Sequence, residues 1–96
     1  MGSYIVTEGA EQDLNEISRY IATDNPDAAI RLTYRFFDLF ELLAEDPKLG
    51  RERPELSPGL RSIPEGNYIL FYRIWAREVG IVRVVHAARD LHEIFS

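Results

Sequence analysis

The stretch Tyr68–His86, which reads YILFYRIWAREVGIVRVVH, decides the fold of this chain. Residues 68–75 and 81–86 are rich in β-branched and aromatic side chains, which favour β-strands. Residues 76–80 between them are few enough to form a hairpin, so the two runs are predicted to pair as antiparallel strands. A further run, residues 60–63, precedes them across the short connection 64–67. Together the three runs predict an antiparallel meander over residues 60–86.

Upstream of the meander, a short strand leads into a first helix. Residues 4–7 (YIVT) form the β-rich run, and residues 8–22 then change to the spacing of an amphipathic helix. Its apolar residues fall on one face and are predicted to be buried: Ala10, Leu14, Ile17, Tyr20 and Ile21. The acidic residues of its opening turns are predicted to lie in solvent, where they complement the helix dipole: Glu8, Glu11, Asp13 and Glu16.

A second helix begins at Asn25-Pro26, where asparagine is a good cap and proline suits the first helical position. Its apolar residues sweep roughly 200° of the helical wheel, about twice an ordinary amphipathic stripe. We interpret this arc as core, covered by the first helix on one flank and by the sheet on the other. The alternative is that a partner protein covers part of the arc. Asp46-Pro47 ends the helix, and prolines and glycines predict an irregular loop over residues 46–59.

The predicted element order is therefore β-α-α-β-β-β. This order defines an α+β domain in which a helical hairpin packs on a twisted antiparallel sheet. The chain has 96 residues and a mass of 11.1 kDa, enough for one core, so residues 1–96 are expected to form a single domain. Residues 90–95 predict either a brief terminal helix or a packed tail.

The amino-acid composition excludes several classes of function. The net charge of −5 divides into −6 over residues 1–50 and +1 over residues 51–96, and ten of the eleven basic residues are arginines. A negative net charge disfavours direct nucleic-acid binding, sequence-specific or not. The guanidinium groups of the arginines suit partners that carry carboxylates. The chain has no cysteine, no apolar run long enough for a membrane span and no glycine-rich phosphate loop. We therefore expect a cytoplasmic protein that has no cofactor and does not enter a membrane.

One constellation of residues would serve RNA cleavage. His86 would be the general base for a 2′-hydroxyl, while Arg61 and Arg83 would hold the phosphate. No tyrosine follows Tyr72 to protonate the leaving oxygen, and Phe95 has no hydroxyl that could do so, which weakens this hypothesis. The two histidines stand six residues apart, a spacing that matches no established metal pattern, so no metal site is expected either.

Each of these residues also has a structural interpretation. Arg83 would pair with Asp90 or Glu78, and His86 would be a hydrogen-bonded residue at the end of a strand. Strand alternation places Arg83 and His86 on opposite faces of the sheet if the strand stays regular. Arg89 and Asp90 would fix the tail through charge-assisted hydrogen bonds.

Four motifs follow one another along the chain: Pro47-x-x-Gly50, Leu60-Arg61-Ser62, Tyr68–Tyr72 and Arg83-x-x-His86-x-x-Arg89-Asp90. In this joint pattern, and along nearly its whole length, the chain resembles the ParE branch of the RelE/ParE toxin superfamily. The resemblance implies the toxin of a type II toxin–antitoxin pair. Toxins of the ParE branch act on DNA gyrase, whereas the RelE branch cuts messenger RNA in the ribosome. The terminal tyrosine and the lysine cluster of the RelE branch are absent here, which favours the ParE branch.

The resemblance implies two partners: a ParD-like ribbon-helix-helix antitoxin, and DNA gyrase, with its A subunit as the expected contact. It also implies a non-enzymatic inhibitor. Two alternatives stay open: a ribosome-dependent endoribonuclease of RelE type, and an inactive toxin that serves only as antitoxin partner and co-repressor. The residues expected to bind the target or the antitoxin are Arg61, Arg73, Arg83, His86, Arg89, Asp90, Phe36, Phe37 and Phe40.

Overall fold

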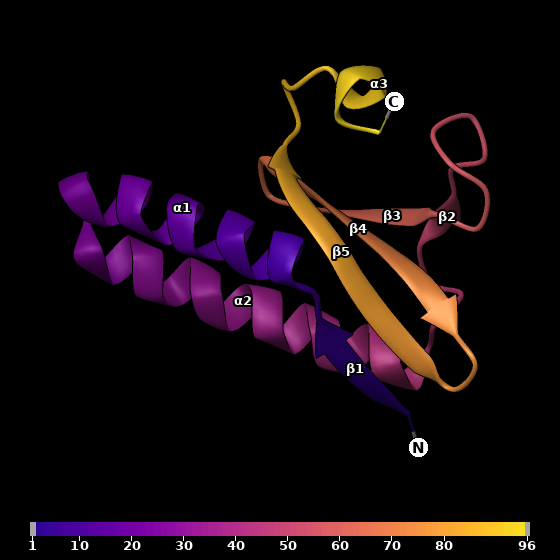
Figure 1. The fold of residues 1–96 in the computed structure, drawn as a ribbon. Coiled ribbons are helices and arrows are strands. Elements are labelled where there is room, and N and C mark those ends of the chain that lie inside the picture. Colours follow the sequence, from indigo (N-terminus) through magenta and orange to yellow (C-terminus); the bar gives the residue numbers. More distant parts are fainter. Residues whose placement is uncertain (1, 96) are drawn as a thin grey trace.

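A helical hairpin lies along one face of a five-stranded sheet (Figure 1). The computed structural model describes residues 2–95. The elements in chain order are β1 (Ser3–Val6), α1 (Glu8–Asp24), α2 (Pro26–Glu45), β2 (Arg51–Glu52), β3 (Arg61–Glu65), β4 (Tyr68–Trp75), β5 (Glu78–His86) and α3 (Leu91–Ile94). The α+β class and the helical hairpin are confirmed. Within residues 2–95, no helix has both the length and the hydropathy that crossing a bilayer requires.

The strand order in the sheet is β1-β5-β4-β3-β2. Strands β3, β4 and β5 form the predicted antiparallel meander, with β2 added antiparallel to β3. Strand β1 runs parallel to β5, so the sheet is mixed and the prediction of a wholly antiparallel sheet is wrong for this strand. The reason is that residue alternation predicts a strand but not its direction, and β1 is joined to its partner β5 through most of the chain rather than by a hairpin turn that would fix the direction.

Several predicted boundaries move in the structure. The predicted loop 46–59 contains β2, which pairs through Arg51 and Glu52 with β3. Strand β3 continues through Pro64 and Glu65, which leaves only residues 66–67 as the turn. Pro64 is tolerated because β2 pairs with residues 61–62 alone, so the strand edge is free where proline lacks its N–H. Strand β5 likewise starts at Glu78, and residues 76–77 make the turn.

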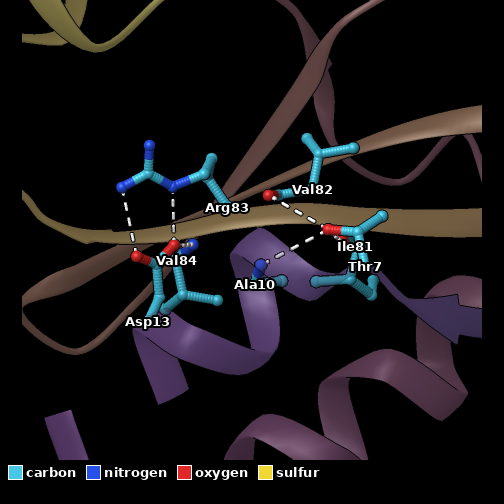
Figure 2. Close-up of polar contacts among 7 residues, drawn as sticks. All are labelled: Thr7, Ala10, Asp13, Ile81, Val82, Arg83 and Val84. Atoms are coloured by element: carbon cyan, nitrogen blue, oxygen red, sulfur yellow. Dashed lines mark hydrogen bonds and ion pairs between the residues drawn. The ribbon is translucent and has the colours of Figure 1, made fainter. Parts of the chain in front are cut away.

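Both helices begin at the residues that the sequence indicates. The side chain of Thr7 caps α1 and accepts a hydrogen bond from the backbone N–H of Ala10 at 3.3 Å (Figure 2). Asn25 caps α2 and accepts from the N–H of Ala28 at 3.1 Å, with Pro26 in the first turn. Each cap satisfies one of the amide groups that a helix start leaves unpaired.

The main core lies between the helical hairpin and the sheet. Its largest fully buried side chains on this face include Phe36, Phe40, Tyr72 and Ile81. The Tyr72 hydroxyl donates to the carbonyl of Pro47 at 2.7 Å and accepts from the N–H of Gly50 at 2.8 Å, and burial raises the pKa of this hydroxyl. These bonds hold the chain after α2 against the sheet.

Residues at the far end of the hairpin differ from the prediction. Leu14, Ile17 and Ile21 pack against the core as expected, but Tyr20 is 80% exposed, so its predicted burial is wrong. In Figure 1 the end of the hairpin, where α1 passes into α2, extends beyond the sheet. Tyr20 therefore has the helical spacing of a core residue but no strand opposite it.

A smaller apolar cluster lies on the other face of the sheet. Leu60, Phe71 and Val85 are buried there. The C-terminal segment covers them: α3 is a short helix, and the ring of Phe95 lies 4.6 Å from that of Phe71, centroid to centroid. Of the two forms predicted for residues 90–95, the structure has the helix, and α3 packs on the sheet as a lid over this cluster.

Near the β4–β5 turn, Trp75 depends on a glycine in the neighbouring strand. Gly80 is buried, and a Cβ atom built on it would overlap the indole ring of Trp75. The indole thus occupies the space that any other residue at position 80 would need, while 40% of Trp75 stays exposed.

Gly80→Ala should displace the indole of Trp75 and lower the free energy of unfolding by about 1–3 kcal/mol, because an added methyl overpacks the contact. Trp75 is the only tryptophan, so its fluorescence emission reports the displacement directly. The matched control is Gly9→Ala in α1, where the new Cβ would lie 3.5 Å from its nearest neighbour. That control should keep the emission and stabilise the helix by up to about 1 kcal/mol. Unchanged emission in Gly80→Ala would contradict this description.

Candidate functional site

A carboxylate of α1 fastens the helix to the middle of β5 (Figure 2). Asp13 accepts from Arg83 through Nε at 2.7 Å and through Nη2 at 3.1 Å, and also from the backbone N–H of Val84 at 2.9 Å. The Asp13 side chain is only 11% exposed, and the hydrogen bond to it raises the pKa of Arg83. We call this three-bond contact the Asp13 clamp.

The Asp13 clamp corrects two predictions. Asp13 was expected to lie in solvent with the other acids of α1, and Arg83 was expected to pair with Asp90 or Glu78; the structure joins Asp13 and Arg83 to each other. The sequence does indicate that Asp13 faces the sheet. Asp13 lies three residues after Ala10 and four before Ile17, which places Asp13 on the buried face of the helix rather than on the opposite face.

A β-bulge in β5 determines on which face of the sheet the Arg83 side chain starts. The register shifts between Phe71 and Tyr72: Phe71 pairs with Arg83 but Tyr72 pairs with Ile81, which leaves Val82 as an extra residue. Cross-strand partners share a face of the sheet, so Arg83 starts on the face of Phe71, away from the helices. Strand β1 ends at Val6 beside Ile81, and the guanidinium reaches past the open edge of β5 to Asp13, as Figure 2 shows.

Beside the clamp lies a hollow of about 700 Å³, between the helical hairpin and the end of β5. We call it the His86 hollow. His86 and Arg89 line it from the end of β5, Tyr20 and Arg35 line it from the helices, and Tyr68 lies between. The Tyr68 and His86 rings meet edge to face at 5.5 Å between centroids. The structure thus brings His86 and Arg89 together as predicted site residues.

The ring of His86 is held in one orientation by a backbone amide two residues further along the chain. Its Nδ1 accepts a hydrogen bond from the N–H of Ala88 at 3.1 Å. A nitrogen that accepts carries no proton, so in the neutral ring the proton is on Nε2. A general base needs a free lone pair, and here the lone pair of Nδ1 already faces an amide. This matches the predicted structural role, a hydrogen-bonded residue at a strand end.

The other arginines predicted for the site lie elsewhere. Arg61 donates to the carbonyl of Gly50 at 2.7 Å, and its side chain is 16% exposed. Arg73 donates to the carbonyl of Pro58 and to the hydroxyl of Ser57, which fixes the loop before β3. Each guanidinium is bound within the chain, as Arg83 is.

Arg61 and His86 are too far apart to share a reacting group. Arg61 pairs with Tyr72 of β4, and His86 pairs with Tyr68, four residues away on the same strand. Strand spacing and rise then put Arg61 and His86 about 10 Å apart across the sheet and about 13 Å apart along it. Arg83 starts on the other face of the sheet, and its guanidinium is bound to Asp13. The three residues of the RNA-cleavage hypothesis therefore do not converge in this structure.

The other residues predicted to bind the target or the antitoxin differ in how buried they are. Phe36 and Phe40 are 2% and 0% exposed, so they belong to the core and present no surface to a partner, which corrects their place among the predicted binding residues. Phe37 is 40% exposed. Asp90 caps α3 by accepting from the N–H of His92 at 3.1 Å, and Arg89 is exposed beside the hollow.

Sequence reasoning missed three residues of the hollow: Tyr20, Arg35 and Tyr68. The helical spacing of Tyr20 predicts a core residue, Tyr68 has only the signal of a strand residue, and Arg35 has no signal that indicates a site. Arg35 also reaches Glu65 at 3.5 Å, which links α2 to the end of β3. Within residues 2–95, no three His, Asp or Glu side chains are grouped so that they could hold a metal ion.

Comparison with solved structures defines the class of fold. The toxin–antitoxin complex RelBE2 from Mycobacterium tuberculosis contains a chain that is 29% identical, with a TM-score of 0.60 over 88% of this chain and 96% of that chain. The chromosomal ParDE system from P. aeruginosa gives a TM-score of 0.77 at 22% identity, over 90% of this chain and 96% of that chain. The fold is therefore that of the ParE and RelE toxins.

Sequence comparison identifies the branch. Residues 4–91 match the family described as the ParE toxin of the type II toxin–antitoxin system parDE. Toxin ParE3 of Caulobacter vibrioides is 30% identical over 92 residues, which cover 95% of this chain and 92% of that protein. This chain belongs to the ParE family and is the toxin of a type II toxin–antitoxin system.

The tautomer of His86 can be measured. Because the Ala88 amide donates to Nδ1, nitrogen-15 NMR of the neutral ring should show protonated Nε2 and unprotonated Nδ1. The exposed His92 serves as the internal reference. A neutral His86 ring protonated on Nδ1 would contradict the hydrogen bond and would free Nε2 as a base.

Proposed function

We propose that this toxin is a non-enzymatic inhibitor of DNA gyrase, acting in the cytoplasm and neutralised by a ParD-like ribbon-helix-helix antitoxin. Membership of the ParE family supports the proposal. The observation that carries it is the arrangement of Arg61, Arg83 and His86: two guanidinium groups are bound inside the chain and the third residue has its Nδ1 occupied. A toxin that cleaved RNA with these residues would need them at one phosphate.

The contact with gyrase is proposed at the His86 hollow and the residues that follow β5. Two exposed cations line this hollow: Arg89, and Arg35, which also reaches Glu65 at 3.5 Å. Of the two acids that line it, Asp13 is paired with Arg83 and Glu16 is exposed. Tyr20 is largely exposed there, and tyrosine and arginine are enriched among the residues that dominate protein–protein binding. An acidic segment of the antitoxin at the same surface would block the toxin by direct competition.

Gyrase supercoiling with purified enzyme tests the proposal. The toxin should inhibit supercoiling and leave cleaved DNA, and Arg89→Glu should weaken inhibition by about tenfold or more, because it reverses a charge at the proposed contact. The matched control is Arg77→Glu, which reverses an exposed charge at the β4–β5 turn, the other end of β5. It should inhibit like the unaltered toxin.

The same preparations in a translation extract distinguish the enzymatic alternative. We expect intact transcripts with the toxin at concentrations that stop gyrase. Transcripts cut inside ribosomes, with cutting lost in His86→Ala, would replace the gyrase proposal by the RelE-type one. Normal growth of bacteria that express the toxin without its antitoxin would instead support a toxin reduced to a co-repressor.

A further inference from the structure

Strand β1 is an edge of the sheet and leaves backbone groups unpaired. Within residues 2–95 it pairs only with β5, and no strand lies on its other side. The N–H of Thr7 donates to Ile81, so by strand alternation Ile5 and Ser3 also face β5. The N–H and C=O groups of Tyr4 and Val6 point to the free edge, where they offer the hydrogen bonds of a ladder to another strand.

Two hollows lie against this edge, one at each end of β1. The first, of about 370 Å³, is lined by Val6, by Leu14 of α1 and by Thr33 and Phe37 of α2, and is mainly apolar. The second, of about 580 Å³, lies beside Ser3 and Tyr4.

The second hollow carries negative charge. Its α2 wall consists of Asp38, Glu41, Leu42, Ala44 and Glu45, and among the described residues no Lys or Arg lines it. Leu42 is 50% exposed, which gives the hollow an apolar patch among the acids. A basic side chain with a long aliphatic stem would cover the leucine and bring its charge to the carboxylates.

We propose that the free edge of β1 binds an extended segment of a partner protein by strand addition. Backbone bonds to Tyr4 and Val6 would supply the pairing, as in other strand-addition complexes. Along β1 the hollows lie two to three residues apart, and alternate side chains of a strand are about 6.6 Å apart. The segment therefore places an apolar residue in the first hollow, beside Phe37, and a lysine or arginine two positions away in the second hollow, against Asp38 and Glu41.

A second copy of this chain does not fit the same edge. Its own edge strand, Ser3–Val6 (SYIV), contains no basic residue. Pairing two copies through β1 would bring both acidic walls towards one strand pair, which is unfavourable for like charges. The site also lies beside residues 78–81 of β5, at the opposite end of that strand from His86, so the inference does not depend on gyrase as the target.

The probe is a labelled synthetic peptide whose core reads lysine-threonine-leucine-threonine-lysine, which presents a lysine two positions from the leucine in either strand direction. It should bind at least about 10-fold more tightly than the same peptide with glutamates for lysines. A second control, with an N-methyl group on every core amide, lacks strand donors in either direction and should bind at least about 10-fold more weakly. Hydrogen exchange of the Tyr4 and Val6 amides should slow on binding.

Two variants locate the site. Glu41→Lys should remove the preference for the lysine peptide, whereas Asp27→Lys, an equal charge reversal at the exposed start of α2, should keep it. The inference is overturned if the lysine peptide does not bind, if the glutamate or the N-methylated peptide binds as well, or if the amides that slow on binding lie outside β1. A dimer in sedimentation whose formation slows exchange of the Tyr4 and Val6 amides would also overturn it.

Discussion

The carboxylate of Asp13 is the constraint on which the arrangement of helices and sheet depends. It accepts two bonds from the Arg83 guanidinium and one from the backbone of β5, in a place where water has little access. Charge-assisted bonds of this kind are stronger than neutral ones, and losing one partner leaves the other charge partly buried and unpaired. Because β1 ends at Val6, the Asp13 clamp continues the attachment of the N-terminal half of the chain along β5.

Internal bonds such as the Asp13 clamp also limit which arginines are available at the surface. The chain uses Arg61, Arg73 and Arg83 for internal bonds, so these arginines order the sheet and its loops rather than gather around a phosphate. In the proposal made above, recognition falls to the exposed groups around the His86 hollow. Exposed tyrosine and arginine side chains are of the kinds that dominate protein–protein binding.

Much of the fold follows from local sequence. Runs such as 68–75 and 81–86 predict the meander, and Asn25-Pro26 predicts the start of α2, because these signals act over a few residues. The site was harder to predict. Asp13 and Arg83 lie 70 residues apart, and their contact needs both the extra residue in β5 and the parallel pairing of β1. Neither the direction of a strand nor a register shift leaves a local pattern.

A double-mutant cycle on Asp13 and Arg83 tests the central claim most directly. The free energy of unfolding is measured in denaturant for the unaltered chain, Asp13→Ala, Arg83→Ala and the double variant. The account predicts a coupling energy of about 1–3 kcal/mol, because each single change leaves a charge without its partner. A coupling below about 0.5 kcal/mol, the range of independent sites, would contradict the role given to this ion pair.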